Sequence, residues 1–272
     1  MTPTPTPTVH LVGAGPGDPM LLTRRAARLL ARADVVVLDR RSLDAIAALA
    51  PPGAERIFVG RADGHPAWDT DAVADLLTEC ARNRRNRRLP AHSPAGSAGS
   101  VDRADSAAGT DLPTVVRLKS GDPFVCSRGG EEMAALHARG VHVEVTPGVS
   151  AATAAPLAAG LTRGRTVTFV AGNHDPVHPA TDLAALAALA DPAGSLVVLV
   201  GRARQAAIAD ALVAAGLDPT TPAAVVHGAT RTGTRVIHTT VAALGRHRLP
   251  PPAIVVIGPA PSPRPEVHSA HP

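Results

Sequence analysis

The chain has 272 residues, of which 45% are apolar, 18% charged and 1% aromatic, and its formal net charge is +4. This composition is typical of a soluble globular protein, and no apolar run approaches the roughly 20 residues that a membrane helix needs. The scarcity of aromatic residues argues against a nucleic-acid binder, because such proteins usually interleave aromatic and basic side chains. Lys119 is the only lysine, so arginine dominates the positive charge, which suits phosphate or carboxylate ligands.

The N-terminal stretch and the two cysteines indicate the cellular compartment in which the protein is expected. Residues 1–8, "MTPTPTPT", have neither a basic region nor an apolar core, so we expect a disordered leader rather than a secretion signal. Cys80 and Cys126 lie far apart and form no C-x-x-C pattern. A reduced, cytoplasmic protein is therefore expected.

Strands and helices alternate through the first half of the chain. Apolar runs typical of strands occur at 9–12, 34–39, 56–60 and 113–119, and the spacing at 21–31 and 69–82 predicts helices, the second capped by Asp69. A further strand, in "VHVEVTPG", leads into a small-residue helix after Pro147. Residues 82–111, which include the Arg-rich "RNRRNRR", have no periodicity and are expected to form a disordered, solvated insertion.

A second alternation begins near Arg165. Strands are expected in "TVTFVAG", "SLVVLVG", "PAAVVHGAT", "TRVIHTTV" and "PAIVVIGPA", and helices in "DLAALAALA" and "ARQAAIADALVAAG". The fold class is therefore α/β, with two α/β domains that meet near residues 150–165. We place the domains at 9–160 and 161–262, followed by a disordered tail at 263–272.

Two glycine-rich turns each follow a strand. Gly13, Gly15 and Gly17 form G-x-G-x-G, in which the third glycine comes one residue too early for a dinucleotide fingerprint. The second turn is "SGDPFVCSRGGEE", and both turns would lie at one carboxyl edge of a parallel sheet. Asp18 and Asp122 disfavour a phosphate there and fit a neutral or cationic ligand. A purely structural turn remains an alternative for the first stretch.

Five segments resemble, in order and spacing, those of the tetrapyrrole methylase family: "LVGAGPGDPMLLT", "VVVLDR", "VVRLKSGDPFVCSRGGEE", "VTPGVSAATAAPLAAG" and "PAIVVIG". The resemblance extends from about Val9 to Pro259, apart from the insertion. It implies two α/β domains with S-adenosylmethionine bound in the cleft between them, and a homodimer. No metal is expected, because the histidines show no H-E-x-x-H or other paired metal spacing. The implied reaction is C-methylation of an acidic tetrapyrrole, namely uroporphyrinogen III to precorrin-2 in sirohaem and cobalamin biosynthesis.

The resemblance also implies individual site residues. The proton acceptor falls on Asp39, and Arg61 occupies the proton-donor position, where the family usually has lysine. A guanidinium with a pKa above about 12 is a poor proton donor, so Arg61 would act as a carboxylate clamp. An ion pair of Asp39 with Arg40 or Arg41 is the alternative for that carboxylate. The implied contacts to the methyl donor are Pro16, Ser120, Gly121, Asp122, Val125, Ser150, Ala151, Val200 and Ala229.

The sequence departs from the family pattern at several points. "KSGDP" replaces "KGGDP", Cys126 and Ser127 stand where phenylalanine and glycine are usual, "GLTRGRT" is shortened, and "VHGAT" replaces "VENGT". Three alternatives therefore stay open: a methylase for another precorrin position, a catalytically impaired homologue that binds donor or tetrapyrrole, and an NAD-dependent oxidoreductase. Cys126 is more simply a packed apolar side chain than a reactive thiol.

Overall fold

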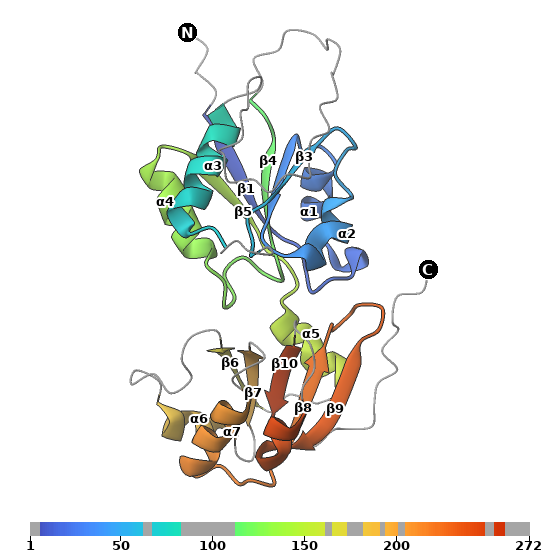
Figure 1. Cartoon of the computed structure of the whole chain (residues 1–272), viewed down its shortest axis with the longest axis vertical. Coiled ribbons are helices and arrows are strands. Elements are labelled where there is room, and N and C mark those ends of the chain that lie inside the picture. Colours follow the sequence, from blue (N-terminus) through green and yellow to red (C-terminus); the bar gives the residue numbers. More distant parts are fainter. Residues whose placement is uncertain are drawn as a thin grey trace. The chain divides into compact units, whose positions relative to one another are not determined.

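The computed structural model describes residues 6–61, 67–82, 112–160, 165–172, 182–190, 194–200, 205–247 and 253–258. It divides into two units, each with its own sheet (Figure 1). Unit 1 comprises residues 1–14 and 22–148, and unit 2 comprises residues 15–21 and 149–272. The units thus divide at Gly148–Val149, whereas the sequence placed the domain boundary at 160–161. The predicted tail and most of the predicted leader and insertion lie outside the described residues. Residues 6–8 of the leader are described, with Thr8 in the first strand, and Arg82, the first residue of the predicted insertion, is still helical.

Unit 1 is built on a parallel sheet of five strands in the order β3-β2-β4-β1-β5. The strands are β1 (Thr8–Gly13), β2 (Val35–Leu38), β3 (Glu55–Phe58), β4 (Val115–Lys119) and β5 (His142–Thr146). Strands β1 and β4 are direct neighbours, with Gly13 beside Lys119. The prediction that both glycine-rich turns follow parallel strands at one sheet edge is therefore confirmed.

Helices cover both faces of this sheet (Figure 1). Helices α1 (Arg24–Leu30) and α2 (Asp44–Ala47) pack on one face, and α3 (Thr70–Arg82) and α4 (Gly129–Ala138) pack on the other. The Asp69 carboxylate accepts a hydrogen bond from the Ala72 backbone N–H at 2.8 Å, so the predicted helix cap is confirmed. Two 3-10 turns, η1 (Pro19–Leu21) and η2 (Arg41–Leu43), precede α1 and α2 in the sequence, and η1 belongs to unit 2.

Side chains alternate between the two faces, because successive residues of a strand point in opposite directions. Val37 and Val115 belong to the core under α3 and α4, whereas Val36 and Val116 belong to the core under α1 and α2. The same alternation places Arg117 on the face that α3 and α4 cover, close to the carboxyl ends of the strands.

Unit 2 contains a mixed sheet of five strands in the order β6-β7-β10-β8-β9. The strands are β6 (Thr166–Gly172), β7 (Gly194–Val200), β8 (Pro222–His227), β9 (Arg235–Thr240) and β10 (Ala253–Ile257). Within the described residues of this unit, only β6 and β7 pair in parallel; β10 lies antiparallel to both β7 and β8. The carboxyl ends of β7 and β8 consequently share one sheet edge.

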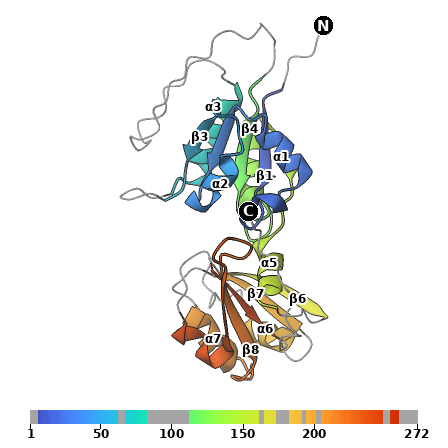
Figure 2. The same ribbon diagram turned by 90° about the vertical axis from the view of Figure 1, so that its right-hand side faces the viewer.

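The helices of unit 2 also pack on its sheet (Figure 2). Helices α6 (Leu183–Ala190) and α7 (Gln205–Ala214) and the 3-10 turn η3 (Val241–Arg246) share one core with alternate strand residues such as Val198. Helix α5 (Ala151–Ala158) contacts β7 and β10. None of the helices in the described ranges combines the length and hydropathy that a membrane span requires.

Candidate active site

Three chain segments meet backbone to backbone at the carboxyl edge of the unit 1 sheet. The Ala14 N–H, after β1, donates to the Lys119 carbonyl at 2.8 Å. A Cβ atom added to Gly13 would lie 2.5 Å from the Gly148 nitrogen and 2.7 Å from the Gly121 carbonyl oxygen. Gly121 itself has a φ of 68°, in the left-handed region. Only glycine permits this approach of the segments that follow β1, β4 and β5.

Two aspartates organise the glycine-rich turns. Asp18 accepts a hydrogen bond from the Met20 N–H at 2.8 Å. Asp122 accepts from the Phe124 N–H at 2.8 Å and, with its second oxygen, from the Gly148 N–H at 3.1 Å. From the sequence, these carboxylates are expected only to disfavour a phosphate ligand. Their hydrogen bonds show that both also shape the backbone of their turns.

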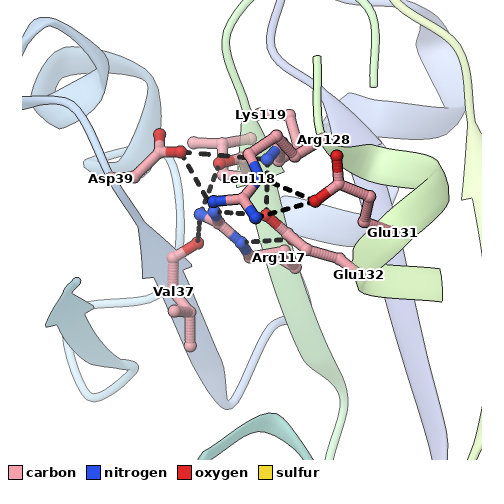
Figure 3. Close-up of polar contacts among 8 residues, drawn as sticks. All are labelled: Val37, Asp39, Arg117, Leu118, Lys119, Arg128, Glu131 and Glu132. Carbon is pink, nitrogen blue, oxygen red and sulfur yellow. Dashed lines mark hydrogen bonds and ion pairs between the residues drawn. The ribbon is translucent and has the colours of Figure 1, made fainter. Parts of the chain in front are cut away.

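A network of four charged side chains lies beside this edge, on the face covered by α4 (Figure 3). Arg117, which is 2% exposed, donates from Nε and Nη2 to the two oxygens of Glu132 at 2.9 and 3.0 Å. Its Nη2 also donates to Asp39 Oδ2 at 3.0 Å. Lys119 Nζ lies 2.6 Å from Glu132 Oε1 and 3.8 Å from Asp39 Oδ2. The network therefore joins two carboxylates to two cations in a mostly buried setting.

The Arg117 guanidinium is held by hydrogen bonds from all three of its nitrogen atoms. In addition to these three bonds, Nη1 donates to the backbone carbonyls of Val37 at 3.5 Å and Leu118 at 3.3 Å. A guanidinium has five N–H groups, and all five have acceptors within the protein. Arg117 thus has no N–H group left for a ligand.

The network sets the charge of its members. Burial by itself raises the pKa of Asp39, but attraction to Arg117 and Lys119 and the hydrogen bond from Arg117 outweigh burial and lower that pKa. Burial also raises the pKa of Glu132, but the charges of Arg117 and Lys119 and their hydrogen bonds outweigh it, so that pKa is lowered as well. For Lys119, burial and the neighbouring Arg117 lower the pKa despite the two carboxylates. Both carboxylates are therefore anionic at neutral pH.

Asp39 is the accessible member of the network. Its side chain is 30% exposed. Its Oδ1 is itself buried and has no hydrogen-bond partner within the described residues. Its ion-pair partners are Arg117 and Lys119 rather than Arg40 or Arg41, so the alternative pairing considered for the sequence is wrong. The reason is strand register, which sets Val37 beside Arg117 and so directs Asp39 toward β4.

Arg61 lies close to Asp39 in the fold. The preceding Gly60 packs directly on the Asp39 carbonyl, and a Cβ atom there would overlap that oxygen. The Arg61 side chain is exposed. The parallel pairing of β2 and β3 thus brings both predicted catalytic residues to one sheet edge.

The predicted donor-binding residues fall into two groups. Ser120, Gly121, Asp122 and Val125 belong to the turn after β4 in unit 1. The others, which belong to unit 2, are Pro16, Ser150, Ala151, Val200 and Ala229.

Within unit 2, these residues occupy turns and element ends. The Pro16 carbonyl accepts from Arg231 Nε at 3.1 Å, and the Ser150 hydroxyl caps α5 by accepting from the Ala152 N–H at 3.2 Å. Val200 ends β7 beside Ala253, which is also paired with His227 at the end of β8. Ala229 is two residues further along the chain, so Val200 and Ala229 approach the same sheet edge.

Two residues next to predicted donor positions have strained backbones. Cys126 follows Val125 and has a φ of 49°, and Thr230 follows Ala229 and has a φ of 68°. Positive φ values are rare outside glycine, above all for a β-branched residue. The Thr230 hydroxyl is buried and lacks a partner among the described residues. Burial raises the pKa of the Cys126 thiol, which favours a packed side chain over a reactive thiolate.

Arg117, Lys119 and Glu132 were not among the site residues predicted from the sequence. A signal was present, since "VVRLK" places two cations at alternate positions of a strand that is otherwise apolar. Buried cations require carboxylate partners, and "GGEE" supplies them in the next helix. Among the described residues, no group of three or more His, Cys, Asp and Glu side chains could hold a metal ion.

Comparison with known proteins identifies the family. The model for Tetrapyrrole (Corrin/Porphyrin) Methylases matches residues 8–245. An S-adenosyl-L-methionine-dependent uroporphyrinogen III methyltransferase from Methanosarcina barkeri is 34% identical over 259 residues, or 92% of this chain and 90% of that protein. A siroheme synthase from Chromobacterium violaceum is 35% identical over 92% of this chain, but the match covers 48% of that protein. The chain thus spans about half the length of the siroheme synthases that it matches.

A solved structure agrees with these relatives. The uroporphyrin-III C-methyl transferase from Thermus thermophilus complexed with S-adenyl homocysteine superposes with a TM-score of 0.67 and is 34% identical, covering 92% of this chain and 97% of that one. The α/β fold class predicted from the sequence is confirmed by the two sheets and by this neighbour. By sequence and by fold, the chain belongs to the tetrapyrrole methylase family.

Proposed function

We propose that the protein transfers methyl groups from S-adenosylmethionine to ring carbons of uroporphyrinogen III, which gives precorrin-2 for sirohaem and cobalamin. The observation that carries the proposal is the carboxyl edge of unit 1. There, the glycine-rich turn that begins at Ser120 follows β4, and Asp39 follows the neighbouring β2. The relatives of similar length from Methanosarcina barkeri and Thermus thermophilus are named as methyltransferases of uroporphyrinogen III and uroporphyrin III, respectively.

The turns of unit 1 fit a methyl donor. The contact among Gly13, Gly121 and Gly148 leaves no room for a Cβ atom, so it presents backbone rather than side chains to its surroundings. S-adenosylmethionine combines an uncharged adenosine with a sulfonium cation, and it needs hydrogen bonds and apolar contacts rather than a phosphate cradle. When bound, it supplies an electrophilic methyl group. The nine donor-binding positions named from the family resemblance remain proposals for its contacts.

The residues of this chain would orient the substrate and accept a proton. Methyl transfer to carbon depends mainly on alignment of the nucleophilic carbon with the methyl group. Asp39, which is anionic and 30% exposed, accepts the proton that the methylated ring loses. Arg61, which is exposed beside Asp39, holds a substrate carboxylate through a charge-assisted pair.

The assembly and the compartment also remain proposals. We infer a homodimer from the family resemblance alone, which light scattering on the purified protein would check. A cytoplasmic location fits the two free cysteines, Cys80 and Cys126.

A direct assay tests the function. Purified protein is incubated with methyl-labelled S-adenosylmethionine and uroporphyrinogen III, and the products are identified by mass. Two added methyl groups support the proposal, whereas addition at another ring position, or to another precorrin only, favours the alternative methylase. Donor binding without transfer favours an impaired homologue. Stabilisation by NAD instead of S-adenosylhomocysteine in a thermal-shift measurement would contradict the family assignment of the ligand.

A further inference from the structure

Glu132 is the centre of the charged network, although within the described residues no hydrogen bond or ion pair joins it to Asp39. It accepts two hydrogen bonds from Arg117 and one from Lys119, with N–O distances of 2.9, 3.0 and 2.6 Å. Asp39 receives one hydrogen bond from Arg117, at 3.0 Å, whereas the Lys119 ammonium remains 3.8 Å away. Both cations therefore contact Glu132, and Arg117 alone also donates a hydrogen bond to Asp39 (Figure 3).

The buried part of the network has no capacity to bind a substrate. All five N–H groups of Arg117 donate to protein acceptors, and both oxygens of Glu132 accept hydrogen bonds. Glu132 is 5% exposed and Arg117 is 2% exposed. Only Asp39 combines a partly exposed side chain with an oxygen, the buried Oδ1, that has no partner in the described residues. The other members thus act on the reaction through Asp39.

We infer that Glu132 is a positioning residue, which holds Arg117 and Lys119 so that the Asp39 carboxylate keeps Oδ2 bound and leaves the buried Oδ1 unpaired. The inference rests on the proposed role of Asp39 in methyl transfer. Without Glu132, two buried cations face a single carboxylate, to which Arg40 adds further positive charge. The Lys119 ammonium then moves onto Asp39 and occupies the oxygen that the reaction needs.

A double-mutant cycle tests whether Glu132 acts through Asp39. In the parent background, Glu132→Gln is expected to lower kcat by about 10- to 100-fold, because small displacements of a reacting group have effects of that size. In an Asp39→Asn background, the same change is expected to lower the residual rate by less than about two-fold. The affinity for S-adenosylhomocysteine should be unchanged. Equal losses in both backgrounds, or a parent-like kcat, would overturn the inference.

Glu131→Gln is the matched control. Glu131 precedes Glu132 in the same helix, is 59% exposed, and pairs with Arg128 at the surface. The identical substitution there is expected to leave kcat unchanged. A comparable loss would mean that any charge change in the first turn of α4 disturbs activity, which contradicts a specific role for Glu132.

The pH profile separates positioning from a general loss of structure. Glu132 raises the pKa of Lys119 by charge and by hydrogen bonding, whereas burial and Arg117 lower it. In Glu132→Gln, the Lys119 ammonium that has moved onto Asp39 releases that carboxylate when it loses its proton, so kcat of this variant should recover as the pH rises. Glu131→Gln should show no such recovery. A profile for Glu132→Gln that follows the parent at alkaline pH would contradict the role assigned to Lys119.

Two further measurements keep the inference testable. If Glu132→Gln does not fold, as judged by thermal unfolding, Glu132→Asp takes its place. This variant retains the charge but is too short to reach both cations, and it should lower kcat only when Asp39 is present.

If the parent does not methylate uroporphyrinogen III, the proposed function fails by itself. The carboxyl ¹³C resonance of Asp39, assigned with Asp39→Asn, should then still change in Glu132→Gln and not in Glu131→Gln. An unchanged resonance would overturn the inference independently of activity.

Discussion

Arg117 and Asp39 are hydrogen-bonded across neighbouring strands, with Arg117 Nη2 donating to Asp39 Oδ2 at 3.0 Å. The bond follows from strand register, because Val37 lies beside Arg117 and Asp39 continues the same face two residues later. It converts an otherwise apolar sheet face into a charged one at the carboxyl edge. The stability of this part of unit 1 should therefore depend on a balance of buried charges.

Replacement of Arg117 should strongly destabilise the protein. Arg117→Met leaves Glu132 without its bidentate partner and Asp39 without its hydrogen bond, and breaking a buried ion pair typically costs about 3–5 kcal/mol. Arg128→Met is the matched control, since Arg128 is 59% exposed and pairs with Glu131 at the surface. It should change the free energy of unfolding by less than about 1 kcal/mol. Urea denaturation of the three proteins measures the difference, and equal effects would contradict the importance of burial.

Acid should destabilise the protein through the same network. The folded-state pKa values of Asp39 and Glu132 are lowered, so the unfolded chain binds protons first as the pH falls. Their contribution is fully present above about pH 5, where unfolded carboxylates are ionised, and is lost progressively below about pH 4. We expect the free energy of unfolding to fall less steeply with acid in Glu132→Gln than in the parent. Chemical denaturation over this pH range gives both slopes, and identical slopes would exclude the network as the cause.

The sequence predicted the parallel strands of unit 1 and the edge where the glycine-rich turns lie, because alternation and turn residues are local signals. It did not predict α2, since four residues are too few for a helical period. The sequence also did not predict that β10 lies between β7 and β8, because pairing between distant strands has no local signature. The charged network was missed for a related reason. "VVRLK" shows two buried cations, but only strand register and the position of α4 show that Asp39 and Glu132 are their partners.

The strained residue at position 126 offers a test of stability near the proposed donor site. Cys126 has a φ of 49°, a conformation that costs a residue with a Cβ atom about 1–2 kcal/mol. Cys126→Gly should therefore raise the free energy of unfolding by roughly 1 kcal/mol, partly offset by the greater freedom of glycine in the unfolded chain. Thermal and urea unfolding measure this change.

Ser127→Gly is the control for Cys126→Gly, because Ser127 is not among the residues with positive φ. That substitution should destabilise the protein by about 0.5–1 kcal/mol through unfolded-state entropy alone. If both variants are destabilised equally, the backbone at Cys126 is not strained.

The pair Asp39 and Arg61 tests the proposed chemistry most directly. Asp39→Asn removes the proton acceptor but leaves the glycine-rich backbone contacts intact, so it should lose most methyl transfer while S-adenosylhomocysteine affinity is retained. General-base catalysis typically contributes about 10²- to 10⁴-fold, which sets the expected loss in kcat. Arg61→Lys keeps the positive charge beside Asp39 and should retain or increase the rate, whereas Arg61→Ala should weaken tetrapyrrole binding and raise KM. The measurement is the methyl-transfer rate of each variant on uroporphyrinogen III, with donor affinity by calorimetry. A parent-like rate for Asp39→Asn would exclude this carboxylate as the base, and loss of donor affinity in the same variant would show that Asp39 serves donor binding instead.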